Sequence, residues 1–123
     1  MAEELRALAR FTCRLRLEDL PEPALDAARR CVLDNLGAAL GAAESPEIRS
    51  ILQAYEDWAG LGKNGLEAAA WGQGRRTGLF NALLCNGLLS HELELDDVHT
   101  GSKSHVGAVV IPAAWTLADA LGA

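Results

Sequence analysis

The sequence predicts an all-α protein, a single compact domain of about five helices over residues 1–123. Ala and Leu supply 43 of these residues while Val, Ile and Thr supply 12, and Ala and Leu lose little side-chain freedom in a helix. Apolar residues also recur at steps of three and four, which is the helical period. The length fits one domain, and neither an internal repeat nor a linker divides the chain.

The first three predicted helices are amphipathic. Residues 1–17 place Leu5, Leu8 and either Phe11 or Thr12 on one side. Residues 21–43 begin with Pro-Glu-Pro, which suits a first helical turn, and the apolar face is Leu25, Ala28, Val32, Leu36 and Ala39. The third helix begins at Ser45-Pro46 and ends before the glycines of residues 60–65. Its apolar stripe is Ile48, Ile51, Leu52, Tyr55 and Trp58.

The last two predicted helices are more apolar. Residues 77–95 are apolar nearly all round, which predicts a helix packed on several sides. Residues 107–121 form a helix only if Pro112 lies in its first turn, with Gly122 as the stop. The predicted buried face of this helix is Ala114, Leu117, Ala118 and Leu121. Between these helices and the third, the glycines of residues 62–76 predict a loop that includes at most one short strand.

Composition excludes several classes of protein. The net charge of −6 argues against nucleic-acid binding, which needs clustered Lys and Arg. No apolar run approaches the roughly 18 residues of a membrane span, and the start does not resemble a secretory signal, so we expect a soluble, cytoplasmic protein without membrane contact. Cys13, Cys31 and Cys85 lack a C-x-x-C pair and are predicted to be buried free thiols.

Polar chemistry is concentrated in residues 91–105, HELELDDVHTGSKSH, which hold all three histidines, four carboxylates, three hydroxyls and one lysine. This segment joins the two most apolar helices, so its side chains are candidates for a pocket wall. The alternative is an ordinary solvated loop with acidic residues near a helix end.

Three kinds of site compete for this segment. A metal site would use His91, Glu94 or Asp97, and His99 or His105, although no known metal motif is present. A nucleophilic triad would need Ser102 or Ser104 beside His105, but neither serine lies in a G-x-S-x-G turn. The third is general acid/base chemistry by His105 with carboxylate neighbours, because imidazole titrates close to neutral pH.

The remaining charged candidates for the site also have purely structural explanations. Asp96 and Asp97 are adjacent, so we expect at most one to face His105 while the other caps, orients or faces water. Lys103 offers a positive charge to an anionic substrate, as do Arg75 and Arg76, although surface charge is the commoner role for all three.

Four blocks of the sequence resemble the MmgE/PrpD family in order and spacing. They are LDNLGAALG at residues 33–41, AWGQGRR at 70–76, NG at 86–87 leading to HELELDD at 91–97, and SHVGAVVIP at 104–112. The family includes 2-methylcitrate dehydratase, cis-aconitate decarboxylase and iminodisuccinate epimerase. The resemblance covers about residue 20 to the end, and it implies the N-terminal part of the family's helical domain.

The resemblance also implies a lyase or isomerase that abstracts a proton next to a carboxylate of a small polycarboxylate, with no cofactor and no metal. The implied catalytic residues are His105, Asp96 and Asp97. We predict substrate contacts at Glu94, which the resemblance implies, and at five further candidates: Lys103, His99, Arg75, Arg76 and His91. The sequence departs from the family at Glu94, where Asp is usual, at Val98, where Thr is common, and at Val106, where Pro follows the histidine.

Family members continue well beyond residue 123 into further helices and a mixed α/β lid. We therefore expect a split or truncated enzyme, or one completed by self-association, whose partner is a second copy or a second chain carrying the rest of the fold. Exposed apolar area on the segment 77–95 would favour such association. The alternative function is a non-catalytic helical assembly module, a remnant of such an enzyme.

Overall fold

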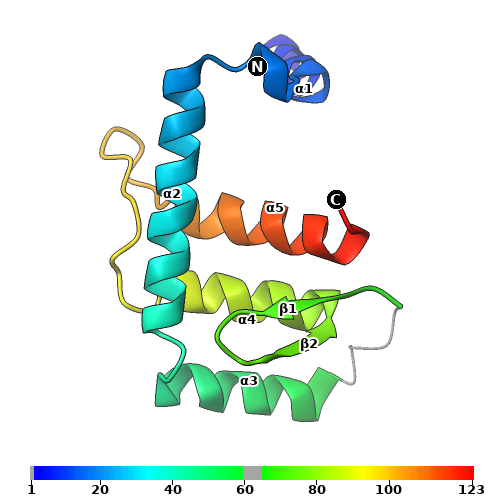
Figure 1. Cartoon of the computed structure of the whole chain (residues 1–123), viewed down its shortest axis with the longest axis vertical. Helices are drawn as coiled ribbons and strands as arrows, with labels where there is room; N and C mark the ends of the chain where they lie inside the picture. The colour runs from blue at the N-terminus through cyan, green and yellow to red at the C-terminus, as the bar shows by residue number, and fades with distance from the viewer. Residues whose placement is uncertain (1, 60–64) are drawn as a thin grey trace. The chain divides into compact units, whose positions relative to one another are not determined.

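The computed structural model describes residues 2–59 and 65–123 (Figure 1). It confirms the predicted mostly helical fold and adds one small sheet that was not predicted. The glycines at positions 60 and 62 and the Trp58 side chain, all named in the predicted third helix and its end, lie outside the described part. The chain divides into two compact units, residues 1–30 and 31–123.

The first unit holds α1 (Ala2–Arg14), a single 3-10 turn (Leu17–Asp19) and the start of α2 (Glu22–Gly41). The predicted helix over residues 1–17 is therefore shorter by one turn. None of the described residues of α1 is buried, and its apolar side chains Leu5, Leu8 and Phe11 are exposed.

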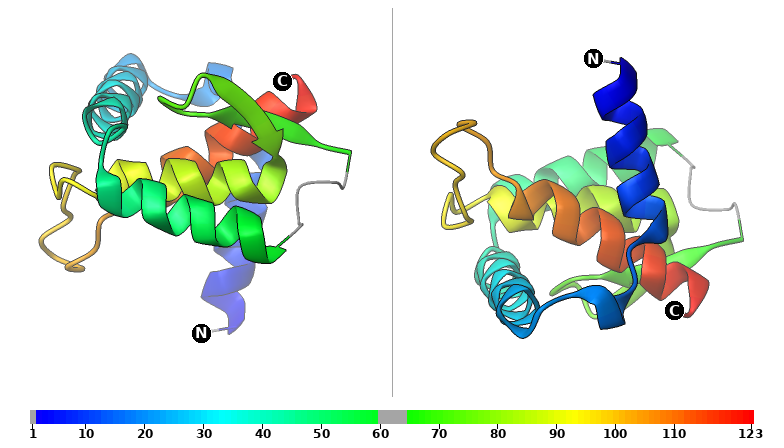
Figure 2. Two further views of the ribbon diagram at one scale, coloured as in Figure 1. Left: turned by 90° about the horizontal axis from the view of Figure 1, so that it is seen from below. Right: turned by 90° about the horizontal axis from the view of Figure 1, so that it is seen from above.

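The second unit holds the end of α2, α3 (Pro46–Ala59), α4 (Leu79–His91), α5 (Gly107–Leu121) and a hairpin of β1 (Glu67–Ala70) and β2 (Arg75–Gly78). The helix α4 packs against α3, α5 and both strands (Figure 2). This arrangement confirms the prediction of a helix covered on several sides. The core cluster is Ala39, Ala42, Ile48, Leu52, Ala70, Trp71, Cys85 and Leu89.

The hairpin differs from the predicted loop with at most one strand. Its strands pair antiparallel with Ala70 opposite Arg75, and the turn between them contains Gly72 and Gly74 at positive φ. Glycine adopts this backbone region without steric cost, so the two glycines indicated a tight turn rather than a loop. Because Thr77 and Gly78 belong to β2, the helix predicted from residue 77 begins at Leu79.

A buried amide joins the hairpin, α4 and α5. The Trp71 backbone N–H donates to Asn86 Oδ1 at 2.8 Å. The Asn86 Nδ2 group in turn donates to the Ala69 carbonyl at 3.0 Å and to Thr116 Oγ1 at 2.9 Å. Asn86 is completely buried, so these bonds replace the water that its amide loses on folding.

The helix α5 corrects two expectations. Pro112 lies inside the helix beyond its first turn, and it is buried. The predicted face was also wrong, because Leu117 and Leu121 are exposed, whereas the buried residues are Gly107, Ala108, Pro112 and Thr116. The pattern misled because α5 is apolar on most sides, so that periodicity alone could not select the packed side.

The prediction that the three cysteines are buried free thiols is confirmed only in part. All three cysteines are free, but only Cys85 is buried, while Cys13 and Cys31 are exposed. Both exposed cysteines lie on amphipathic helices, where their neighbours do not decide which face they occupy. Among the described residues, no helix combines the length and apolar character that crossing a membrane requires.

Candidate active site

The segment between α4 and α5 turns back on itself twice. The helix α4 ends at His91, and Glu94 adopts a left-handed conformation with φ of 49°. Lys103 is left-handed as well, with φ of 52°, and it lies in a turn closed by the His99 N–H bond to the Ser104 carbonyl at 2.9 Å. The left-handed conformation is less stable by about 1 to 2 kcal/mol for residues other than glycine. The rest of the fold therefore stabilises both residues in this conformation.

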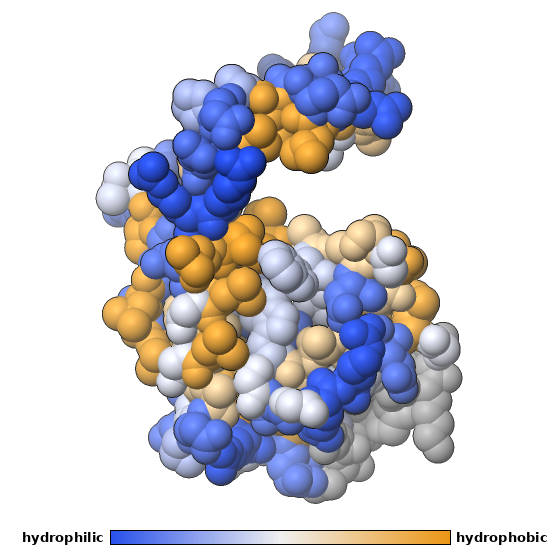
Figure 3. All heavy atoms as spheres, in the orientation of Figure 1, coloured by the Kyte–Doolittle hydropathy of each residue, from blue (hydrophilic) through white to orange (hydrophobic). Residues whose placement is uncertain are grey.

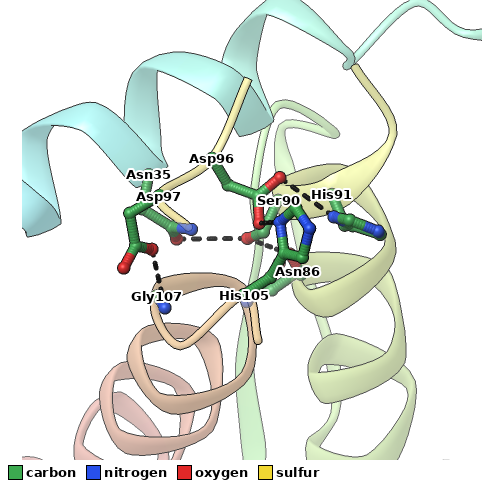
Figure 4. Close-up of polar contacts among 8 residues, drawn as sticks. All are labelled: Asn35, Asn86, Ser90, His91, Asp96, Asp97, His105 and Gly107. Carbon is green, nitrogen blue, oxygen red and sulfur yellow. Dashed lines mark hydrogen bonds and ion pairs between the residues drawn. The ribbon is translucent and has the colours of Figure 1, made fainter. Parts of the chain in front are cut away.

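These turns bring Asp96 between two imidazoles (Figure 4). Its Oδ1 lies 2.9 Å from His91 Nδ1 and its Oδ2 lies 2.9 Å from His105 Nδ1. The two rings meet edge to face, with centroids 4.7 Å apart. The Asp96 side chain is completely buried, whereas the His91 and His105 side chains are 49% and 37% exposed. One buried carboxylate therefore holds two imidazoles that remain open to solvent.

The contacts of Asp96 favour its ionised form. Burial raises the pKa of this carboxyl, but the hydrogen bonds from His91 and His105 outweigh burial, and the pKa of Asp96 lies below its ordinary value. Because an ionised carboxylate has only acceptor sites, each Nδ1 must carry the hydrogen in these two bonds.

Asp97 points the other way and fixes the start of α5. Its Oδ1 accepts a 2.7 Å hydrogen bond from the Gly107 N–H, one of the helix's free backbone donors. A side chain at Gly107 would displace the Asp97 carboxylate, because a Cβ atom there would lie 2.1 Å from Asp97 Oδ1. As expected, only one of the two adjacent aspartates faces His105, although both lie in the irregular segment between α4 and α5 and not in a helix.

A buried polar row supports α4 beneath the imidazoles. Ser90 Oγ lies 2.7 Å from the Asn86 carbonyl and 3.1 Å from Asn35 Oδ1, and all three residues are buried. The resembling blocks at residues 33–41 and 86–97 thus meet through Asn35 and Ser90 (Figure 4). Asn35 Nδ2 has no hydrogen-bond partner in the described part of the chain.

The imidazoles face a cavity of about 700 Å³ between α4, α5 and the connecting segment. Its apolar wall comes from Leu83, Leu84, Leu88, Ala108 and Val109, with Gly87 opening space between the leucines. Its polar lining is His91, Glu92, Glu94, Ser104 and His105. The volume suits a small organic molecule, and mostly apolar walls with a few polar groups are typical of ligand sites.

Three of the nine residues predicted for the site line this cavity: His91, Glu94 and His105. Asp96 lies behind the imidazoles, and Asp97 caps α5. The other four lie apart from the lining. His99 Nδ1 bonds to Ser102, and Lys103 lies in the exposed turn. Arg76 pairs with Asp119 at 3.0 Å, and Arg75 lies beside it on β2.

Sequence reasoning missed Glu92 and the leucines of α4 as cavity residues. Glu92 Oε1 accepts a hydrogen bond from Ser45 Oγ at 2.7 Å, which joins the end of α4 to the start of α3. The leucines were interpreted as core because an apolar cavity wall and a packed face give the same pattern. The position of Gly87 between these leucines could have indicated the cavity, since a glycine in a helix often marks a close approach or open space.

The trio could also bind a cation. His91, Asp96 and His105 offer ligand atoms that all lie within 4.8 Å of one another. This set overlaps the metal alternative of the sequence analysis but replaces Glu94 and Asp97 with Asp96. Hydrogen bonds already satisfy both Asp96 oxygens, so the geometry is complete without an ion.

Comparisons with known proteins agree with the resemblance in the sequence. The family model described as the MmgE/PrpD N-terminal domain matches residues 6–123. A cis-aconitate decarboxylase-like protein, oryM, of Aspergillus oryzae is 27% identical over 112 residues, which cover 91% of this chain and 22% of that protein. The cis-aconitate decarboxylase of Aspergillus terreus is 25% identical over 114 residues, 93% of this chain and 22% of that protein.

No solved structure matches the chain. The chain spans about a fifth of the length of the curated relatives that it matches. The family match begins at residue 6, earlier than the residue 20 expected from the motifs, and it includes the whole connecting segment that carries Asp96 and both imidazoles. The chain thus belongs to the MmgE/PrpD family, and it corresponds to the N-terminal domain of that family.

Proposed function

We propose that this chain carries the acid/base part of a lyase or isomerase that removes a proton next to a carboxylate of a small polycarboxylate. The single observation that carries the proposal is the buried Asp96 carboxylate bound to His105 Nδ1 beside the cavity. In this role His105 takes the proton and Asp96 orients the ring and stabilises the imidazolium that forms.

The charge of the cavity indicates what else such an enzyme needs. Its lining includes two carboxylates, Glu92 and Glu94, and no Lys or Arg among the described residues. A polycarboxylate, and the enolate-like charge that forms on it, require nearby positive groups. Lys103, Arg75 and Arg76 remain candidates only if the assembled protein brings them to the cavity. Otherwise a second copy or a second chain, carrying the rest of the fold, supplies these cations.

Turnover of citrate, 2-methylcitrate and cis-aconitate, followed by proton NMR, tests the proposal. Substitution His105→Asn should lower any turnover by at least about 100-fold, the usual contribution of a general acid or base. The control is Thr100→Asn, an exposed residue of the same segment, which should leave the rate unchanged. Undiminished turnover by His105→Asn would contradict the assignment.

Binding provides a test that does not require a complete enzyme. Addition of these acids to the isotope-labelled protein should shift the amide signals of the cavity residues Gly87, Leu88 and Ala108 before those of α3. Because no Lys or Arg lies in the described lining of the cavity, we expect weak binding, at about millimolar concentration. Shifts that avoid the cavity would contradict a substrate site there.

The second candidate function is a non-catalytic helical assembly module. It is favoured by the exposed apolar side chains along α5, including Val109, Val110 and Leu121. A protein that forms a stable assembly yet binds none of the acids would support this function over catalysis.

A further inference from the structure

We propose that His91 is a second proton-transfer residue, which gives a proton while His105 takes one, and that Asp96 sets both rings for this task. The inference rests on the proposed function and deepens it, because the sequence led us to expect His91 as a substrate contact or as a ligand of an alternative metal site, and not as a proton donor. It starts from the symmetry of the site: one carboxylate, two imidazoles and two equal distances of 2.9 Å.

The hydrogen bonds determine where each ring carries its hydrogen. Since both oxygens of ionised Asp96 are acceptors, both Nδ1 atoms are donors. In a neutral ring with hydrogen on Nδ1, the Nε2 atom carries the lone pair, and this atom points away from Asp96 in both residues (Figure 4). Asp96 thus leaves one lone-pair nitrogen on each of two rings that line the cavity.

Position and exposure favour His91 over the other polar residues of the cavity. The two ring centroids are 4.7 Å apart, so both imidazoles reach neighbouring atoms of one small substrate. Both rings line the cavity and are partly exposed. Glu92 is bound to Ser45, and the described contacts of Glu94 include none with Asp96, so neither carboxylate shares the orienting group.

The pair can complete the elimination of water from a hydroxy-polycarboxylate. The His105 Nε2 lone pair takes the proton from the carbon next to a carboxylate, and the electrons of that C–H bond first form an enolate of the carboxylate and then the new C=C bond. The C–O bond breaks with its electrons on oxygen. His91 begins as the imidazolium and donates its Nε2 proton to that oxygen, which leaves as water. The pair begins and ends with one extra proton, which has moved from His91 to His105 overall.

The first test measures the tautomers and needs no turnover. Long-range nitrogen–proton NMR spectra at about pH 8.5, above the ordinary histidine range, should show the hydrogen on Nδ1 in His91 and His105. His99 is an internal reference with the opposite tautomer, because its Nδ1 accepts a hydrogen bond from the Ser102 backbone N–H at 3.2 Å, which leaves the hydrogen on Nε2.

Substitution Asp96→Asn should change this pattern in a specific way. A carboxamide offers one acceptor and one donor group, so only one of the two imidazoles can keep its Nδ1 hydrogen bond as donor. We expect one ring to change to the Nε2 tautomer while His99 stays unchanged. Hydrogen on Nε2 of His91 in the unmodified protein would overturn the inference, as would a stoichiometric metal ion bound to both Nδ1 atoms.

The second test separates the two proton transfers with citrate in heavy water. His91→Gln should lower elimination at least about 100-fold while deuterium still enters citrate at the carbon next to the carboxylate. His105→Gln should lose both processes. If the His91→Gln variant eliminates water at the rate of the unmodified protein, the proposed role of His91 is overturned, but that of His105 is not. Absence of both processes in the unmodified protein would contradict the proposed function, while the tautomer measurement would still decide the role of Asp96.

Discussion

At the scale of single residues, Asp96 links the stability of the fold to its site. Its pKa is lowered in the folded protein, so its ionised form stabilises the fold above the ordinary aspartate value of about 4. This contribution is lost as the pH falls through the lower, folded value. A neutral carboxyl would still occupy the buried space between the rings, but it would accept their hydrogen bonds more weakly.

We predict that Asp96→Asn flattens the acid limb of the stability curve. We expect the free energy of unfolding, measured by urea denaturation, to fall as the pH is lowered from about 5 to about 2. This fall should be steeper in the unmodified protein than in the variant. Asp119 gives a second, independent acid-sensitive site, because the Ala69 N–H and then Arg76 lower its pKa. Asp96→Asn and Asp119→Asn should each remove part of the slope. Identical slopes in all three proteins would contradict this account.

Asp97 is predicted to contribute mainly to positioning. Asp97→Ala removes the acceptor of the Gly107 N–H and should lower the free energy of unfolding by about 1 kcal/mol, as loss of a helix cap does. Asp97→Asn keeps an acceptor oxygen and should cost less. Thermal denaturation of both variants checks the order, and an Asn variant less stable than the Ala variant would contradict the capping role.

The sequence sufficed to predict that the two aspartates divide their tasks, because adjacent side chains point in different directions. It could not predict which one faces the histidines, since that depends on the left-handed turn at Glu94. The same limit applies to Arg76. Its bond to Asp119 joins residues 43 positions apart in the chain, which no local pattern reveals.

At the scale of elements, α4 has two different sides. One side carries Asn86 and Ser90, whose hydrogen bonds join the hairpin, α5 and α2. The other side presents leucines to the cavity. The apolar composition of residues 77–95 therefore predicted a central helix correctly, but it concealed that part of its apolar surface faces a cavity and not the core.

We predict that Asn86 is among the most sensitive positions of the fold. Asn86→Ala leaves the Trp71 N–H, the Ala69 carbonyl and Thr116 without their partner. Each buried group without a partner costs about 1 to 3 kcal/mol, so the variant should lose at least about 3 kcal/mol of stability. Urea denaturation measures this loss. A loss below about 1 kcal/mol would show that water replaces the amide.

Thr116→Val provides the matched control for this prediction. Valine has nearly the same shape as threonine and removes only one of the three partners of Asn86. It should therefore cost clearly less than Asn86→Ala, about 1 to 2 kcal/mol. Equal losses in the two variants would place the energy in the packing of α5 rather than in the buried amide.

At the scale of the whole molecule, the second unit leaves much apolar surface uncovered. Figure 3 shows apolar side chains gathered over the C-terminal half of α2, where Leu33 and Leu40 are exposed. On α5, Val110, Leu117 and Leu121 are exposed at helical spacing. Such surface was expected on residues 77–95, but other elements cover much of that helix, and α5 carries the exposed stripe instead.

We predict self-association, or association with a second chain, through α5. Light scattering after size-exclusion chromatography should detect a species larger than the 13.0 kDa chain. The double variant Val110→Glu and Leu117→Glu should weaken association at least about tenfold, since it places charge on an apolar surface. Thr100→Glu is the control and should leave association unchanged. A monomer at high concentration, with no partner recovered, would contradict the prediction.

The central claim is that Asp96 and His105 move a proton on a small organic acid in the cavity. The most direct measurement is the entry of solvent deuterium into citrate at the carbon next to a carboxylate, with the unmodified protein and with His105→Asn. We predict measurable entry with the unmodified protein and a rate at least about 100-fold lower with the variant. Equal rates for the two proteins would contradict the claim.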